Sequence, residues 1–238
     1  MDMAYLGEFI GTAILILLGD GVVANVILKG TKGNGSGWIV ITVGWATAVF
    51  IPAIMFGTMS GAHFNPALTI ALAAVGIFKG NVVGYIVAQF LGAMVGAFLV
   101  WLLYKDHFDA TEDPGTQLGV FSTGPAIRNT GLNLISEIIG TFVLVFFLTL
   151  GIAQTNDGGL SALGMWRVWA IILTIGISLG GTTGYAINPA RDLGPRIMHA
   201  ILPMKGKGKS DWGYSWIPVV GPVIGGLLGA LVSVAVFG

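Results

Sequence analysis

Two copies of the tripeptide Asn-Pro-Ala carry the clearest chemical information in this sequence: Asn65-Pro66-Ala67 and Asn188-Pro189-Ala190. Asn is a favoured helix N-cap, and Pro is favoured at the first helical position because its missing N–H is not needed there. Each tripeptide is therefore expected to begin a helix. The capping oxygen accepts backbone N–H groups, so we expect the amide NH2 to be free to donate into a lumen. Two such donors beside two positive helix ends would bind hydroxyl or water oxygens and repel cations.

The segments before the two tripeptides are expected to be extended and to line a polar lumen. Irregular backbone at membrane depth is tolerated only where it is buried in protein or faces water. The carbonyl groups of these segments would then form a ladder of acceptors for a passing solute. One Asn-Pro-Ala alone is a weak signal, whereas two at corresponding places are a strong one. The carbonyls expected to line the lumen belong to Gly61, Ala62, His63, Phe64, Gly184, Tyr185, Ala186 and Ile187.

The composition indicates a membrane protein. The chain has 238 residues, of which 55% are hydrophobic and 9% charged, and its mean hydropathy is +0.86. Soluble domains carry about 25% charged residues. Asp, Glu, Lys and Arg are absent from 38–78, 80–104, 168–190 and 212–238, and these stretches cannot form a soluble surface. The net charge of zero gives no argument for binding nucleic acid, and the absence of Cys excludes thiolate metal sites. We expect no metal and no cofactor.

The apolar stretches predict the fold class, because a helix of about 20 apolar residues can span a bilayer. Shorter helices are expected to start near 66 and 189, and polar connectors to occupy 29–37, 105–131, 154–159 and 205–210. The prediction is an all-α membrane protein with six transmembrane helices and two re-entrant half-helices, forming a single domain over 1–238. The six spans are predicted at approximately 4–27, 38–58, 81–104, 132–153, 168–186 and 214–237.

The two halves of the chain repeat. The motif Glu-x-x-Gly-Thr occurs at Glu8 and again at Glu137, each time in the first span of a half. The repeats extend approximately over 4–104 and 132–237. Each contains three spans, an odd number, so the second half must enter the membrane with the opposite topology. The two Asn-Pro-Ala turns then approach the midplane from opposite sides, and broken helices at corresponding places indicate a pathway at their junction.

Four ionisable residues inside the predicted membrane region need an explanation. Arg191 is a lone cation there, and such residues are functional by default. Glu8 and Glu137 are expected to accept hydrogen bonds from the re-entrant loop of their own half, with a proton relay as the alternative. His63 is expected to be a packing residue whose carbonyl lines the lumen, because no second His or carboxylate stands at metal-ligand spacing.

Asp20 is the unusual acidic residue. It lies about 24 Å along the first span at 1.5 Å per residue, near the predicted outer end. We expect an end-of-helix residue at the rim of the vestibule or at a subunit contact. The alternative is an external acidic group that raises local proton availability and favours entry of weak acids such as lactic acid.

The motifs SGAHFNPALT and NPARDLGPR, together with the two Glu-x-x-Gly-Thr segments, resemble those of the major intrinsic protein family of aquaporins and glycerol facilitators. The resemblance covers essentially the whole chain. It implies six spans, two half-helices and a homotetramer with one pore per subunit. It also implies cytoplasmic termini in a cell membrane. The distribution of Lys and Arg alone favours an N-terminus on the outer side of the membrane. We give the resemblance more weight than this charge distribution and predict a cytoplasmic N-terminus.

The resemblance also places a selectivity filter at Trp45, Gly176, Tyr185 and Arg191. Water-selective members are similar to one another in having His where Gly176 stands, so a wider pore is expected here. Trp45 and Tyr185 would offer an apolar wall to a carbon chain while Arg191 binds its hydroxyls.

Tyr185 stands where glycerol facilitators commonly have Phe, and its hydroxyl could narrow the filter, bond Arg191 or contact the solute. Further resemblance to the glycerol-conducting branch lies in Asp192, Arg196, Pro218 and Val219.

The sequence therefore predicts a passive channel for glycerol and similar small neutral solutes, with some water, that excludes protons and ions. Within this class the alternative is a channel that prefers water or protonated weak acids such as lactic acid. A proton-coupled secondary transporter would also have broken helices, but it would need a titratable group at the filter. An intramembrane enzyme is not favoured, because no nucleophile–base pair and no metal cluster stands in the sequence.

Overall fold

The structure is a computed structural model of the chain, and it describes residues 3–153 and 164–238. The predicted connector 154–159 lies outside the described residues. The helices are α1 (Met3–Ile27), α2 (Trp38–Ser60), α3 (Pro66–Ala74), α4 (Val82–Leu103), α5 (Lys105–Ala110), α6 (Pro114–Phe121), α7 (Thr130–Ala153), α9 (Trp166–Leu179), α10 (Pro189–Ile201) and α11 (Ile217–Phe237).

Five helices within the described ranges are long and apolar enough to cross a membrane: α1, α2, α4, α7 and α11. Their outward faces carry large apolar side chains, and on α4 Val83 is 69% exposed and Leu103 is 69% exposed. Soluble monomers rarely show such continuous apolar surfaces. This surface suits lipid, and the chain is a multi-pass integral membrane protein.

Two sequence predictions need correction. The fifth span was expected over 168–186, but α9 ends at Leu179, because the following Gly180 and Gly181 are poor helix formers and the chain turns inward there. The stretch 105–131 was expected to be a polar connector, and no helix was predicted within it, but it contains α5 and α6. The start of α6 has a recognisable signal, since Asp113 caps it by accepting from the N–H of Thr116 at 2.7 Å and Pro114 follows the cap.

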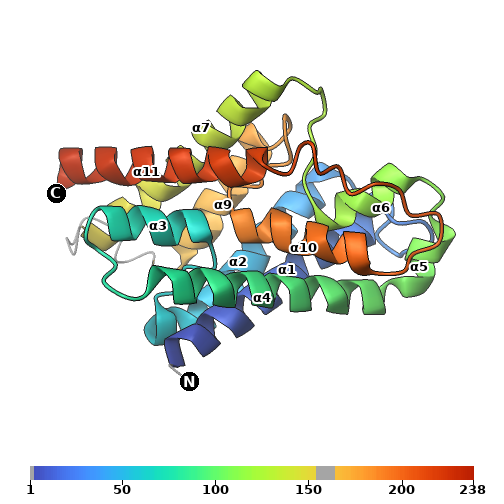
Figure 1. Cartoon of the computed structure of the whole chain (residues 1–238), viewed down its shortest axis with the longest axis horizontal. Helices are drawn as coiled ribbons and strands as arrows, with labels where there is room; N and C mark the ends of the chain where they lie inside the picture. Colours follow the sequence, from blue (N-terminus) through green and yellow to red (C-terminus); the bar gives the residue numbers. More distant parts are fainter. Residues whose placement is uncertain (1–2, 154–163) are drawn as a thin grey trace.

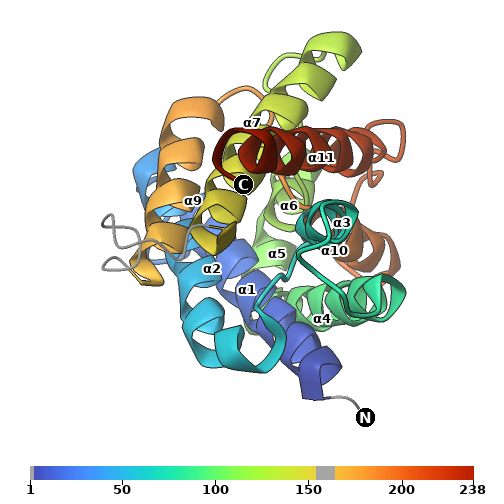
Figure 2. The same cartoon turned by 90° about the vertical axis from the view of Figure 1, so that its left-hand side faces the viewer.

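The two half-helices lie nearly in line at the centre of the molecule, between α4 and α11 (Figures 1 and 2). Each packs on the last long helix of the other half: α3 contacts α11, and α10 contacts α4. A Cβ atom on Gly194 of α10 would lie 2.8 Å from the Cβ of Ala93, so the backbones are close. The halves are therefore interlocked, and neither half-helix can be positioned without the other half of the chain.

Glycines allow the long helices of each half to approach closely. The pairs α1–α4 and α7–α11 pack side by side along the molecule. A Cβ atom on Gly96 would lie 2.5 Å from the carbonyl oxygen of Ala13, and one on Gly229 would lie 2.6 Å from that of Phe142. Small residues at such contacts are the usual means of packing helices in lipid.

We predict that Gly229→Ala destabilises the protein. The new methyl group would press on the backbone of α7, and overpacking of this kind costs about 1–3 kcal/mol. The expected result is a lower unfolding temperature in detergent. The control is Gly213→Ala, because a Cβ there meets no described atom within 4 Å. Equal unfolding temperatures of the two variants would contradict the close packing of α7 and α11.

Candidate functional site

The two Asn side chains cap the half-helices. The Asn65 oxygen accepts from the N–H of Ala67 at 2.9 Å. The Asn188 oxygen accepts from the N–H groups of Ala190 at 3.0 Å and Arg191 at 3.3 Å. Both Asn residues have extended backbone before the first helical residue, a Pro. The helix starts near 66 and 189 are therefore confirmed.

The amide groups of the same residues bond across the two halves. Asn65 donates to the carbonyl oxygen of Ile187 at 2.8 Å, and Asn188 donates to that of Phe64 at 2.8 Å. The expectation that each NH2 would be wholly free was wrong: one of its two N–H groups is used, and one is left for a solute. The carbonyls of Phe64 and Ile187 are likewise partly occupied. A contact between residues more than 120 positions apart left no local signal in the sequence.

The segments before the caps are strained in a matched way. Ala62 and Phe64 have φ of 53° and 48°, and Tyr185 and Ile187 have φ of 39° and 44°. These are left-handed conformations, which cost about 1–3 kcal/mol each for residues other than Gly. Such a backbone persists only where its surroundings hold it in place.

In the first half, the buried carboxylate of Glu8 holds the strained segment. It accepts from the backbone N–H groups of His63 at 2.9 Å and Phe64 at 2.7 Å. It also accepts from the Ser60 hydroxyl at 2.7 Å and the Gln89 amide at 2.8 Å. Neither Ser60 nor Gln89 was singled out from the sequence: Ser60 opens the motif SGAHFNPALT, but no role was given to its hydroxyl, and Gln89 lies outside the motifs.

The second half repeats this arrangement with Glu137. Its carboxylate accepts from the N–H groups of Ala186 at 3.0 Å and Ile187 at 2.9 Å, and from the Thr183 hydroxyl at 2.7 Å. Glu8 is fully buried and Glu137 is 1% exposed. Each carboxylate thus bonds the loop of its own half, the geometry that was expected from the repeated motif.

His63 is fixed by packing and by one hydrogen bond. Its Nδ1 atom lies 3.0 Å from the Thr69 hydroxyl. Its ring contacts those of Phe78 and Tyr85, with centroid separations of 4.8 and 5.2 Å. Thr69 in turn accepts from Gln89 at 2.9 Å, which connects His63 to the same polar cluster as Glu8.

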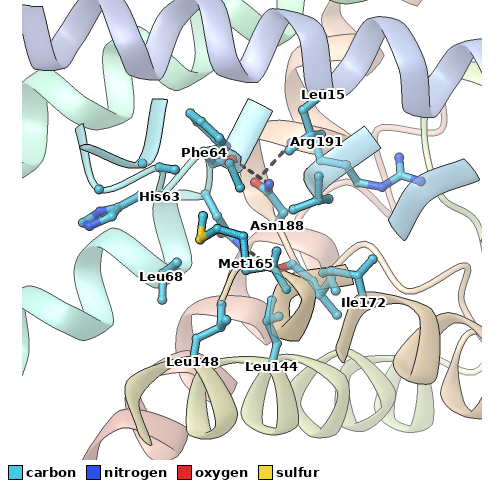
Figure 3. A pocket seen from close by; sticks show the side chains of 18 of the residues that line it. Leu15, His63, Phe64, Leu68, Leu144, Leu148, Met165, Ile172, Asn188 and Arg191 are labelled. Carbon is cyan, nitrogen blue, oxygen red and sulfur yellow. Dashed lines mark hydrogen bonds between the residues drawn. The ribbon is translucent and has the colours of Figure 1, made fainter. Parts of the chain in front are cut away.

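A cavity of about 350 Å³ runs along the two strained segments. One side has both cap residues, Arg191 and the residues of the two strained segments, 61–64 and 185–187. The facing side is apolar, and Figure 3 shows Leu144 and Leu148 of α7 opposite Asn188. Gly184, which was expected to line the lumen, is not among the lining residues. Other apolar residues that line the cavity are Leu15, Val49, Leu68, Leu72, Met165, Val168 and Ile172.

Three of the four expected filter residues lie together at this cavity. The Arg191 guanidinium stacks on Trp45, with 4.0 Å from its central carbon to the ring centroid. Tyr185 also lines the cavity. The tyrosine hydroxyl has no hydrogen-bond partner within the described residues, so the suggested bond to Arg191 is not formed.

Gly176 does not itself line the cavity, because Tyr185 covers it. A Cβ atom on Gly176 would lie 2.9 Å from Cζ of Tyr185, and one on Gly180 would lie 2.5 Å from its Cδ1. These two glycines, one helical turn apart, form a shelf for the tyrosine ring. The space that a side chain at position 176 would take is filled by the Tyr185 ring, and the wider pore expected from this glycine stays a prediction. Trp38, which the sequence did not reveal, braces this shelf by donating to the Gly176 carbonyl at 3.0 Å.

Asp20 is not at the rim of a vestibule. It is fully buried, and its Oδ1 atom lies 4.0 Å from Nη1 of Arg191. The rise per residue gave its depth along α1 but not the direction of its side chain, which is why the expected external position was wrong. Arg191 is consequently not a lone cation, and a titratable group does stand beside the filter.

Two charged residues of α10 that follow Asn188 connect this helix to the loops that contain Thr123 and Ser210. Asp192 and Arg196 form a buried ion pair of 2.9 Å. Asp192 also accepts from the N–H and hydroxyl of Thr123, both at 2.7 Å, and Arg196 donates to the carbonyl of Ser210 at 2.8 Å. Pro218 and Val219 lie in the first turn of α11, and Pro218 is buried.

Comparison with known proteins agrees with this geometry. The family model described as "Major intrinsic protein" matches residues 2–233. The chain belongs to the major intrinsic protein family. The glycerol uptake facilitator protein of Streptococcus pneumoniae is 58% identical over 95% of this chain and 96% of its own length. That of Bacillus subtilis is 54% identical over 98% of this chain and 85% of its own length.

A solved structure shows the same fold. The aquaglyceroporin from Plasmodium falciparum is 32% identical and matches with a TM-score of 0.82, over 96% of this chain and 93% of that one. This member of the major intrinsic protein family therefore has the aquaporin fold, as the sequence predicted.

We predict that Glu137→Gln severely destabilises this family member. The amide NH2 would face N–H groups that need an acceptor, and hydrogen bonds to a charged group contribute about 1.5–3 kcal/mol each. The measurement is the yield of folded protein and its unfolding temperature in detergent. The control is Glu112→Gln, an exposed residue of the loop before α6. Wild-type stability of Glu137→Gln would contradict the holding role of the carboxylate.

Proposed function

We propose that this protein is a passive channel that facilitates diffusion of glycerol and similar small neutral solutes, with some water, while excluding protons and ions. The observation that carries the proposal is the two-sided cavity, with an apolar wall on α7 and α9 facing the cap residues and Arg191. Glycerol has a carbon edge and a hydroxyl edge that match the two sides. The names of the relatives from Streptococcus pneumoniae and Bacillus subtilis support the choice of solute.

Within this proposal, the filter consists of Trp45, Gly176, Tyr185 and Arg191. Trp45 and the ring of Tyr185 contact the carbon edge of glycerol. Arg191 and the unpartnered Tyr185 hydroxyl bind its oxygens. Gly176 acts indirectly, by providing the shelf that lets Tyr185 withdraw from the axis.

Proton exclusion is assigned to the centre of the cavity. Each cap residue retains one N–H for a water or hydroxyl oxygen, and the positive ends of α3 and α10 meet there. A cation at this point has lost its hydration shell and meets a positive potential. Arg191 adds a second barrier.

The assembly and placement in the cell follow from the family resemblance. We propose a homotetramer with one pore per subunit in the plasma membrane, with both termini cytoplasmic. The proposed inverted repeats are 4–104 and 132–237 within one channel domain. Support comes from the matched contacts of Glu8 and Glu137 and from the exposed apolar faces of the long helices.

The test is stopped-flow light scattering on proteoliposomes, comparing glycerol with water. Wild-type protein is expected to speed glycerol entry well above protein-free vesicles. Gly176→His should lower glycerol permeability by about tenfold or more while largely sparing water, because the imidazole displaces Tyr185 toward the axis. The control Gly181→Ala places its methyl in open space and should match wild type. Equal glycerol permeability of Gly176→His and wild type would contradict this filter.

The alternative within this class, a channel that prefers protonated weak acids such as lactic acid, would admit the neutral form only. Desolvating a carboxylate near the midplane costs several kcal/mol, and Arg191 compensates only locally. Lactic acid flux should therefore track the protonated fraction and fall about tenfold per pH unit above the pKa of the acid. Glycerol flux should stay nearly flat over the same range. A glycerol flux that requires a proton gradient would favour a coupled transporter instead.

A further inference from the structure

Asp20 is a buried carboxylate that lacks the bonds such a group needs. It is fully buried in helix α1. Neither of its oxygens has a hydrogen-bond partner among the residues that the structure describes. Leaving a carboxylate in this condition is costly unless a positive charge stands close by. The buried carboxylates of Glu8 and Glu137 each accept three or more hydrogen bonds from their re-entrant loop and its neighbours. Asp20 accepts none from the described residues, so it does not hold a loop in the way that these two residues do.

The only positive charge within ion-pair range of Asp20, over 3–153 and 164–238, is Arg191. The two side chains approach to 4.0 Å, and Arg191 is 8% exposed. The guanidinium also stacks on Trp45. Trp45 can lie against α1 because Gly19, beside Asp20, has no side chain in its way. Arg191 is thus restrained by α1 through charge and by α2 through an aromatic face.

The neighbouring acidic group is not available for the same task. Asp192 follows Arg191 directly and is fully buried. Its two oxygens are already used by Thr123 and by the ion pair with Arg196 at 2.9 Å. Asp20 is therefore the carboxylate that can balance the charge of Arg191.

We propose that Asp20 is a positioning residue that acts through Arg191. It draws the guanidinium against the wall of the lumen and balances its charge, so that the filter keeps the width that glycerol needs. The N–H groups of Arg191 that point away from Asp20 stay available to the solute. This inference rests on the proposed function, because it explains how the filter residue is held.

The consequence of removing the charge follows from the geometry. In Asp20→Asn only the stacking on Trp45 restrains the guanidinium, which then extends into the lumen. Glycerol is wider than water and should be obstructed more. We expect the ratio of glycerol to water permeability to fall by about threefold or more, because small displacements of positioning groups have large effects.

A double-mutant cycle separates this role from a merely structural one. The variants are Asp20→Asn, Arg191→Val and both together, each measured for glycerol and water in proteoliposomes. If Asp20 acts through Arg191, Asp20→Asn should change the permeability ratio by less than about 1.5-fold in the Arg191→Val background. An equal change in both backgrounds, or no change in either, would overturn the proposal.

Matched controls cover the remaining outcomes. Thr12→Val alters another fully buried polar residue of α1, whose hydroxyl donates to the Glu8 carbonyl at 2.7 Å, and should keep the wild-type ratio. If Asp20→Asn fails to fold, the double variant with Arg191→Val should fold, because it no longer has a buried Arg191 charge without a counter-charge. Failure of both variants to fold would overturn the proposal. Wild-type protein that passes water but not glycerol would contradict the proposed function. The same mutant cycle would then be measured as the ratio of urea permeability to water permeability.

Discussion

The structure depends on two buried carboxylates that hold two strained stretches of backbone. A loop that enters the membrane has N–H groups with no helical partner, and in lipid each of them would be costly. Glu8 and Glu137 accept these N–H groups directly. The left-handed residues can persist because the carboxylates fix the groups around them, and residues of both segments line the cavity. Glu8 and Glu137 therefore fix the two backbone segments that line the cavity.

The same constraint explains why the halves are interlocked. Each half-helix packs on the other half of the chain, and each cap residue donates to the carbonyl of the opposite loop. The centre of the cavity is consequently a rigid junction. Rigidity matters for selection, because a filter can distinguish glycerol from water only if its walls keep their separation. The two filter side chains are also held in fixed positions. Tyr185 packs on Gly176 and Gly180, and Arg191 lies between Trp45 and Asp20.

Much of this arrangement could be predicted from the sequence, and the failures have a common cause. The long helices follow from apolar length, the starts of α3 and α10 from the capping signal, and the bonds of Glu8 from the repeated motif. Contacts between distant side chains left no such signal. The shelf under Tyr185 and the bonds between opposite loops were missed for that reason. Asp20 was misplaced because a position along a helix gives depth and not direction.

The central claim is that one lumen passes a neutral polyol and stops protons. It is tested most directly by measuring both fluxes in the same proteoliposomes, with light scattering for glycerol and an internal pH-sensitive dye under a proton gradient. We predict glycerol permeability well above that of protein-free vesicles, with a proton leak equal to that of protein-free vesicles. A proton leak that rises with the amount of protein, in proportion to the glycerol flux, would contradict the account.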